Sequence, residues 1–113
     1  MAKDKVIKIN KFGGASVCTA DAVKKVAEII HSIDGKIVVV VSAMGKTTNN
    51  LEKVVNLWFN NDMTFWSVFN EVKKYHQNII DELFGKGCEL FFEDFKEIEE
   101  LLTESPSLDY NFE

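Results

Sequence analysis

The sequence has only two cysteines, Cys18 and Cys88, and a single proline among its 113 residues. The cysteines lack Cys-x-x-Cys spacing, and neither has a histidine at ligand spacing, so no structural metal site is expected. The longest apolar run, residues 37–41, is far shorter than the ~20 residues that a membrane-spanning helix needs. The N-terminus lacks the apolar core of a signal peptide, so reduced thiols and a cytoplasmic location are expected.

Basic residues are in the minority, since 18 acidic and 13 basic residues give a formal net charge of -5. A negative chain is a poor bulk partner for nucleic acid or an anionic membrane, although one local positive site can still bind a nucleotide. The apolar share of 46% is that of a soluble globular protein, and the length fits one domain over residues 1–113. Nine phenylalanines and two tryptophans require a core or an interface that buries them.

The first half of the chain, residues 1–49, predicts a β-α-β unit. Residues 5–10 mix β-branched residues with lysines, which predicts a strand with one solvated side. Thr19 is a suitable N-cap for an amphipathic helix that ends near Ser32. The unbroken β-branched run over residues 37–41 is typical of a parallel strand buried on both faces. A right-handed crossover then places the loops that follow the two strands at one edge of the sheet, where open α/β folds bind ligands.

The second half predicts three helices within residues 50–104 and an irregular tail over residues 105–113. The first helix is marked by an apolar stripe, and the second is capped by Thr64 and ended by Gly85. The third covers residues 88–102. Two strands cannot complete a parallel sheet, because each needs neighbours for its backbone groups. The sequence therefore predicts a partial α/β domain with an incomplete sheet. If the chain folds alone, we expect it either to complete the sheet with a second copy of the chain or to be stabilised by helix packing.

A lysine and two glycines follow the first predicted strand and form the most distinctive motif of the chain. It is Lys11-Phe12-Gly13-Gly14-Ala15-Ser16-Val17. Glycines directly after a strand allow a sharp turn and a close approach of a ligand, and a strand followed by a glycine turn and a helix is a common phosphate site. The alternative is a tight connection between strand and helix that binds nothing.

A second polar loop follows the second predicted strand. It is Ser42-Ala43-Met44-Gly45-Lys46-Thr47-Thr48-Asn49. Its Gly45-Lys46 pair resembles the end of a P-loop, but that motif needs a glycine five positions before Gly45, where Val40 stands. The hydroxyl and amide groups at this helix start can bind a carboxylate or a phosphate, or Thr47 or Thr48 can simply cap the helix.

Three other reactive side chains are assigned structural roles. His31 lies at the end of the first predicted helix and His76 lies on an apolar stripe, and neither has a nucleophile or acid partner that the sequence can place. Cys18 is expected to be a small packed thiol.

Together the two motifs resemble those of the aspartate kinases. Residues 11–17 are similar to the Lys-Phe-Gly-Gly-(Thr/Ser)-Ser-Val signature of that family, and residues 40–49 to its Ser-Ala…Thr-Asn loop. The helical second half is similar in layout only. The resemblance implies part of an amino acid kinase domain, of the carbamate kinase-like fold. It implies phosphorylation of the β-carboxylate of L-aspartate by ATP with Mg²⁺, giving 4-phospho-L-aspartate, the first step towards lysine, threonine and methionine.

The resemblance also implies roles for single residues. Lys11 is the implied catalytic group, because positive charge and positioning dominate phosphoryl transfer. The residues implied to bind the phosphates of ATP are Lys11, Gly13, Gly14 and Ser16, and those implied to hold aspartate are Ser42, Thr48 and Asn49. Ala15 stands where the family usually has a hydroxyl residue, which weakens the case for a ligand contact there.

The family's remaining site residues are expected beyond Glu113. The chain alone is therefore expected to be inactive, to bind no cofactor tightly, and to belong to a homo-oligomeric enzyme. Two alternatives stay open. One is another amino acid kinase, of the glutamate or acetylglutamate kinase type, and the other is a non-catalytic α/β interaction module.

Overall fold

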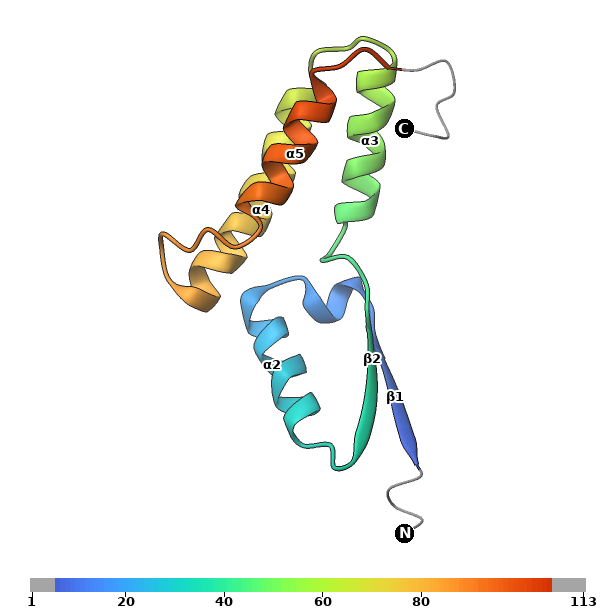
Figure 1. Ribbon diagram of the computed structural model, residues 1–113, viewed down its shortest axis with the longest axis vertical. Helices are drawn as coiled ribbons and strands as arrows, with labels where there is room; N and C mark the ends of the chain where they lie inside the picture. Colours follow the sequence, from blue (N-terminus) through green and yellow to red (C-terminus); the bar gives the residue numbers. More distant parts are fainter. Residues whose placement is uncertain (1–5, 107–113) are drawn as a thin grey trace. The chain divides into compact units, whose positions relative to one another are not determined.

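The computed structural model describes residues 6–106. The chain divides into two compact units, Met1–Thr47 and Thr48–Glu113. The first unit is built from strands and one α-helix, and the second is helical (Figure 1). No helix in the described part of the chain combines the length and apolar character that crossing a membrane requires.

The first unit is a β-α-β unit. Its elements are β1 (Ile7–Phe12), the 3₁₀-helix η1 (Gly14–Val17), α2 (Ala20–His31) and β2 (Lys36–Val41). The strands pair in parallel, with Ile7 opposite Lys36 and Phe12 opposite Val41. This confirms the predicted α/β class, with a sheet that is incomplete in the described residues. β1 extends beyond its predicted end, because the ladder to β2 continues, so Lys11 belongs to the strand and not to the loop.

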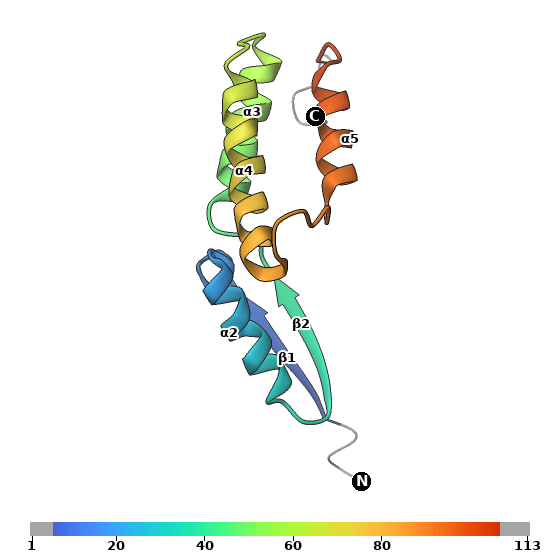
Figure 2. The same cartoon turned by 90° about the vertical axis from the view of Figure 1, so that its left-hand side faces the viewer.

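The two faces of this sheet are covered differently. On one face α2 packs against the strands (Figures 1 and 2), and Phe12 is buried there with Val17 and Val26. On the other face large apolar side chains are exposed. These are Ile7, Ile9, Val38 and Val40. The prediction that residues 37–41 are buried on both faces is wrong for the described residues, because the first unit has a single α-helix and it covers one face.

The start of α2 agrees with the sequence. Thr19 has extended backbone geometry, and its side-chain oxygen accepts a hydrogen bond of 3.1 Å from the backbone N–H of Ala22. Asp21 lies in the first turn, where a negative charge is favourable to the helix dipole. The helix ends at His31, as predicted.

The second unit packs three helices around an aromatic core. They are α3 (Thr47–Phe59), which begins at the last residue of the first unit, α4 (Phe65–Phe84) and α5 (Phe92–Leu102). The buried cluster joins all three helices. Its members are Val54, Trp58, Phe65, Phe69 and Leu102. Each of the three helices therefore contributes apolar residues to one core.

Two predictions about helix starts are wrong. Thr64 precedes α4 in helical geometry and makes no capping bond with its side chain, because its hydroxyl donates to Asp62 at 2.7 Å. The third helix begins at Phe92 rather than near Cys88. Phe91 before it has a φ of 67°, a left-handed conformation that an α-helix cannot include. The predicted tail lies outside the described residues from position 107 onward.

Candidate functional site

Lys11 lies at the carboxyl end of β1 on the face of the sheet that α2 leaves open. Side chains alternate along a strand, so Lys11 lies on the opposite face from its buried neighbour Phe12. Val40, its partner across the ladder, is likewise exposed. The ammonium group of an exposed lysine can reach a ligand at this edge without first losing an internal ion pair.

Gly13 and Gly14 follow Lys11 and have different surroundings. A Cβ atom on Gly13 would have nothing within 4 Å, and the φ of Gly13 is -77°, which any residue can adopt. A Cβ atom on Gly14 would lie 2.6 Å from the carbonyl oxygen of Gly45 and 3.2 Å from that of Ala43. Gly14 is therefore required by packing between the two loops, whereas nothing among the described residues requires a glycine at position 13.

The second predicted loop lies directly against the first. The backbone N–H of Ser42 donates to the carbonyl of Phe12 at 2.9 Å, and that of Gly45 donates to the carbonyl of Gly14 at 3.0 Å. The first of these bonds belongs to the last pair of the ladder, Phe12 opposite Val41, and Ser42 directly follows β2. By strand alternation, Ser42 then falls on the same face as Val40 and Lys11. The fold therefore brings Lys11, both glycines and Ser42 to one edge of the sheet.

The remaining predicted residues are placed as follows. Ser16 lies in η1, with its N–H bonded to the carbonyl of Gly13 at 3.0 Å and its side chain exposed. Thr48 and Asn49 are exposed in the first turn of α3, and they begin the second unit. Thr48 and Asn49 therefore follow Thr47 in the chain, and their distance from Lys11 is not defined by the structure.

Thr47 is the buried hydroxyl of the second loop. Its side chain donates to the carbonyl of Met44 at 2.6 Å, and its backbone N–H donates to the same oxygen at 3.1 Å. Met44 in turn packs on the cluster around Phe12. The hydroxyl of Thr47 therefore fixes the turn that precedes α3.

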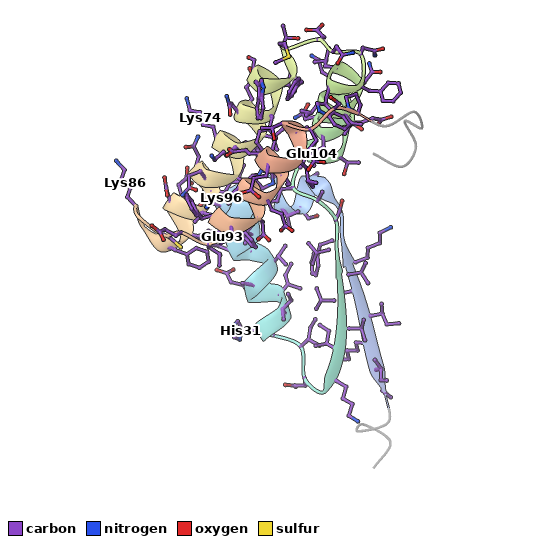
Figure 3. The ribbon with its side chains drawn as sticks, turned by 45° about the horizontal axis from the view of Figure 1, so that its top comes forward. His31, Lys74, Lys86, Glu93, Lys96 and Glu104 are labelled. Atoms are coloured by element: carbon purple, nitrogen blue, oxygen red, sulfur yellow. The ribbon has the colours of Figure 1, made fainter. Side chains whose placement is uncertain are left out.

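The three side chains that were assigned structural roles have different surroundings. His31 is exposed at the end of α2 and points away from the ribbon (Figure 3). His76 is half-buried, with Nδ1 2.8 Å from the carbonyl of Val72 and edge-to-face contacts to Tyr75 and Phe95. Cys18 is partly buried. His76 therefore packs within the helical unit, whereas His31 is exposed to solvent.

A ligand at this edge would be an anion or a polar acid. The donors present are the Lys11 ammonium, the backbone N–H groups of the glycine turn and the hydroxyls of Ser16 and Ser42, and the open space beside Gly13 allows a close approach. This donor set fits the phosphate groups of a nucleotide. Among residues 6–106, no three histidine, cysteine, aspartate or glutamate side chains are grouped as metal ligands.

Gly45 is a residue of this site that sequence reasoning did not single out. Its φ is 55°, and it supplies both the N–H bonded to Gly14 and the oxygen that excludes a Cβ atom there. In the sequence, Gly45 stands out only as part of the Gly45-Lys46 pair that resembles the end of a P-loop. The signal that could have identified it is the pairing of one glycine in each loop.

The chain is similar in sequence to several known proteins. A family model for the amino acid kinase family matches residues 7–90. The chain is 39% identical over 80 residues to "Aspartokinase 1, chloroplastic" of Arabidopsis thaliana, covering 66% of this chain and 14% of that protein. It is 38% identical over 99 residues to "Aspartokinase 3, chloroplastic" of the same plant, covering 83% and 17%. It is 47% identical over 51 residues to "Aspartokinase" of Rickettsia felis, covering 42% and 13%.

These matches confirm the resemblance to aspartate kinases that the two motifs indicate. The chain spans only 13% to 17% of the length of these relatives.

Proposed function

Because this chain belongs to the amino acid kinase family, we propose that it supplies the phosphate-binding part of an aspartate kinase. The proposed reaction transfers a phosphoryl group from ATP to the β-carboxylate of L-aspartate, with 4-phospho-L-aspartate as the product. The product would lead to lysine, threonine and methionine. Similarity to proteins named aspartokinases supports this choice within the family.

The observation that carries the proposal is the open space at Gly13. Gly14 has an internal reason to be glycine, since the carbonyl oxygen of Gly45 occupies the place of its side chain, whereas no described atom lies within 4 Å of a Cβ atom at Gly13. Gly13 has open space where a Cβ atom would stand and lies close to Lys11 at the carboxyl end of a parallel strand. This combination favours close approach by an anion.

ATP bound with Mg²⁺ would supply the phosphoryl group. Lys11 would stabilise the negative charge that spreads over the phosphoryl oxygens during transfer. The backbone N–H groups of Gly13 and Gly14 would orient the same oxygens, which lowers the entropic cost of bringing two anions together. Ser16 would add a hydroxyl donor.

The acceptor would be held by the second loop. Ser42 lies on the face of Lys11 and can donate its hydroxyl to a carboxylate of aspartate. Thr48 and Asn49 are exposed donors at the start of α3 and are proposed to complete this binding. Association of two copies through the open sheet and a cytoplasmic location stay predictions; two of the plant relatives are named chloroplastic.

The test is a titration of the ¹⁵N-labelled chain followed by NMR. ATP with Mg²⁺ should shift the amide signals of Lys11, Gly13 and Gly14, and L-aspartate should shift that of Ser42. L-glutamate and N-acetyl-L-glutamate distinguish the aspartate kinase from the other amino acid kinases. No 4-phospho-L-aspartate should form, because the chain supplies only part of the site.

Lys8 provides the matched control for Lys11. Both are exposed lysines of β1, but Lys8 lies on the face of Phe12. Lys11→Ala should weaken ATP binding by about tenfold or more, which corresponds to about 1.4 kcal/mol, and Lys8→Ala should change it by less than about twofold. Equal effects of the two substitutions would refute the proposed role of Lys11, and an absence of binding at millimolar ATP would favour a non-catalytic module.

A further inference from the structure

Gly45 joins the two loops of the proposed site through its backbone. Its N–H donates to the carbonyl of Gly14 at 3.0 Å, and its own carbonyl oxygen lies where a Cβ atom on Gly14 would be. Two glycines in contact allow an approach of two backbones that side chains would prevent. The φ of Gly45 is 55°, a left-handed conformation that is costly for most residues.

The turn that contains Gly45 is also held by hydrogen bonds between Met44 and Thr47. The carbonyl of Met44 accepts two hydrogen bonds from Thr47, a residue that is 7% exposed. Met44 packs against the apolar cluster that contains Phe12. Gly45 is thus flanked by the well-packed Met44 and Thr47 in the chain and is bonded to Gly14 of the glycine turn.

Ser42 begins a short segment, residues 42–45, that is bonded to the first motif at both ends. Its own N–H is bonded to the carbonyl of Phe12, and three residues later the N–H of Gly45 is bonded to that of Gly14. A segment attached at both ends has few conformations left to lose when it binds a ligand. The position of Ser42 relative to Gly13 is therefore set by these two backbone bonds.

We propose that Gly45 is a positioning residue, which holds the acceptor loop in register with the phosphate-binding glycines. It touches neither substrate and acts through Gly14 and Ser42. The proposal rests on the proposed function, because it assigns phosphate to the first loop and the acceptor to the second. It predicts that a change at Gly45 alters aspartate binding more than ATP binding, since Lys11 and Gly13 stay in place.

The test compares substitutions that share a Cβ atom and differ in their tolerance of a positive φ. Gly45→Ala should weaken L-aspartate binding by about tenfold and ATP binding by less than about threefold. Gly45→Asn should recover most of the lost affinity, because asparagine visits the left-handed region readily. Dissociation constants come from NMR titrations of the labelled chain, and thermal unfolding reports stability.

Gly35 is the control for a merely structural role. It also has a positive φ, of 86°, but it precedes β2 and lies at the opposite end of the strand from the loops. Gly35→Ala should lower the melting temperature and leave both dissociation constants unchanged. A second readout is hydrogen exchange of the Gly45 amide, which L-aspartate should slow in the natural chain.

Each outcome decides between the proposals. Unchanged aspartate binding in Gly45→Ala, while the natural chain binds both ligands, overturns the positioning role alone. An equal loss of aspartate binding in Gly35→Ala also overturns it, because the loss would then follow stability. A natural chain that binds neither ligand overturns the proposed function together with this inference.

Discussion

Trp58 and Leu102 lie 44 residues apart in sequence, and the indole N–H of Trp58 donates to the carbonyl oxygen of Leu102 at 3.0 Å. The same N–H lies 3.1 Å from the carbonyl of Glu104. Trp58 is on α3 and Leu102 is the last residue of α5. The last carbonyls of a helix need partners from outside the regular helix; Thr103 and Glu104 supply them for Glu100 and Leu101. The tryptophan thus caps a distant helix while its ring fills the core.

Removing this N–H should destabilise the helical unit. Trp58→Phe keeps an aromatic ring but leaves the carbonyls without this donor, so we expect a loss of about 1–3 kcal/mol in the free energy of unfolding. Urea unfolding followed by circular dichroism measures the loss. Trp66→Phe is the control, because Trp66 is half-buried and makes no indole hydrogen bond within the described residues. The capping role is wrong if the two variants are equally stable.

The two glycines of the first loop should respond differently to alanine. Gly14→Ala must displace the backbone of Gly45, which lies 2.6 Å from the new Cβ atom, and an overpacked contact of this kind costs about 1–3 kcal/mol. Gly13→Ala meets open space and an ordinary φ, so its stability should stay within about 1 kcal/mol of the natural chain. ATP binding should nonetheless weaken in Gly13→Ala, because the methyl group stands in the path of the phosphate.

Differential scanning fluorimetry and ATP titration of the same two variants check this prediction. A Gly13→Ala chain that binds ATP as tightly as the natural chain would remove the main support for a close phosphate contact. A Gly14→Ala chain of unchanged stability would show that the second loop can move away freely.

The carboxylate of Asp62 should give a pH-dependent contribution to stability. The hydroxyl of Thr64 donates to Oδ1 of Asp62 at 2.7 Å and the backbone N–H of Thr64 donates at 3.0 Å, and these bonds lower the pKa of Asp62 below its ordinary value of 3.8. Because the native pKa lies below the unfolded one, the contribution is present above pH 3.8 and is lost as the pH falls through the native pKa.

NMR titration of the Asp62 side-chain carbon in Thr64 variants tests this relationship. Thr64→Val removes the hydroxyl, the larger cause, and should raise the pKa of Asp62 towards 3.8. Thr64→Ser keeps the hydroxyl and should leave that pKa low. The difference in melting temperature between the natural chain and Thr64→Val should narrow as the pH falls below 3.8. A titration midpoint unaffected by Thr64→Val would contradict the assignment.

Much of the fold could be predicted from local pattern. The β-branched run at residues 37–41, the N-cap at Thr19 and the glycine that ends α4 all act within a few residues of their own position, so short windows of sequence contain the relevant physics. The prediction failed at Thr64 and Phe91, where a neighbouring carboxylate and a left-handed backbone changed the local geometry.

The sequence could predict which residues form the candidate site, but it could not predict the structural role of each one. The sequence placed Lys11, the glycine pair and Ser42 after parallel strands, and β-α-β topology brings such positions to one edge. It treated Gly13 and Gly14 alike. Only the contact with Gly45 separates them, and that contact joins loops that are about 30 residues apart in the chain.

The amino-acid sequence by itself determined the order of strands and helices, because periodicity, capping residues and glycines act locally. It also determined which chemical groups follow each strand, and through them the resemblance to the aspartate kinases. The tertiary structure decided which face of the sheet carries Lys11 and which face α2 covers, because only the packing of α2 against Phe12 distinguishes the two faces. It also decided that Gly14 serves the contact between loops while Gly13 stays open to a ligand, because the carbonyl of Gly45 occupies one of the two spaces and leaves the other free.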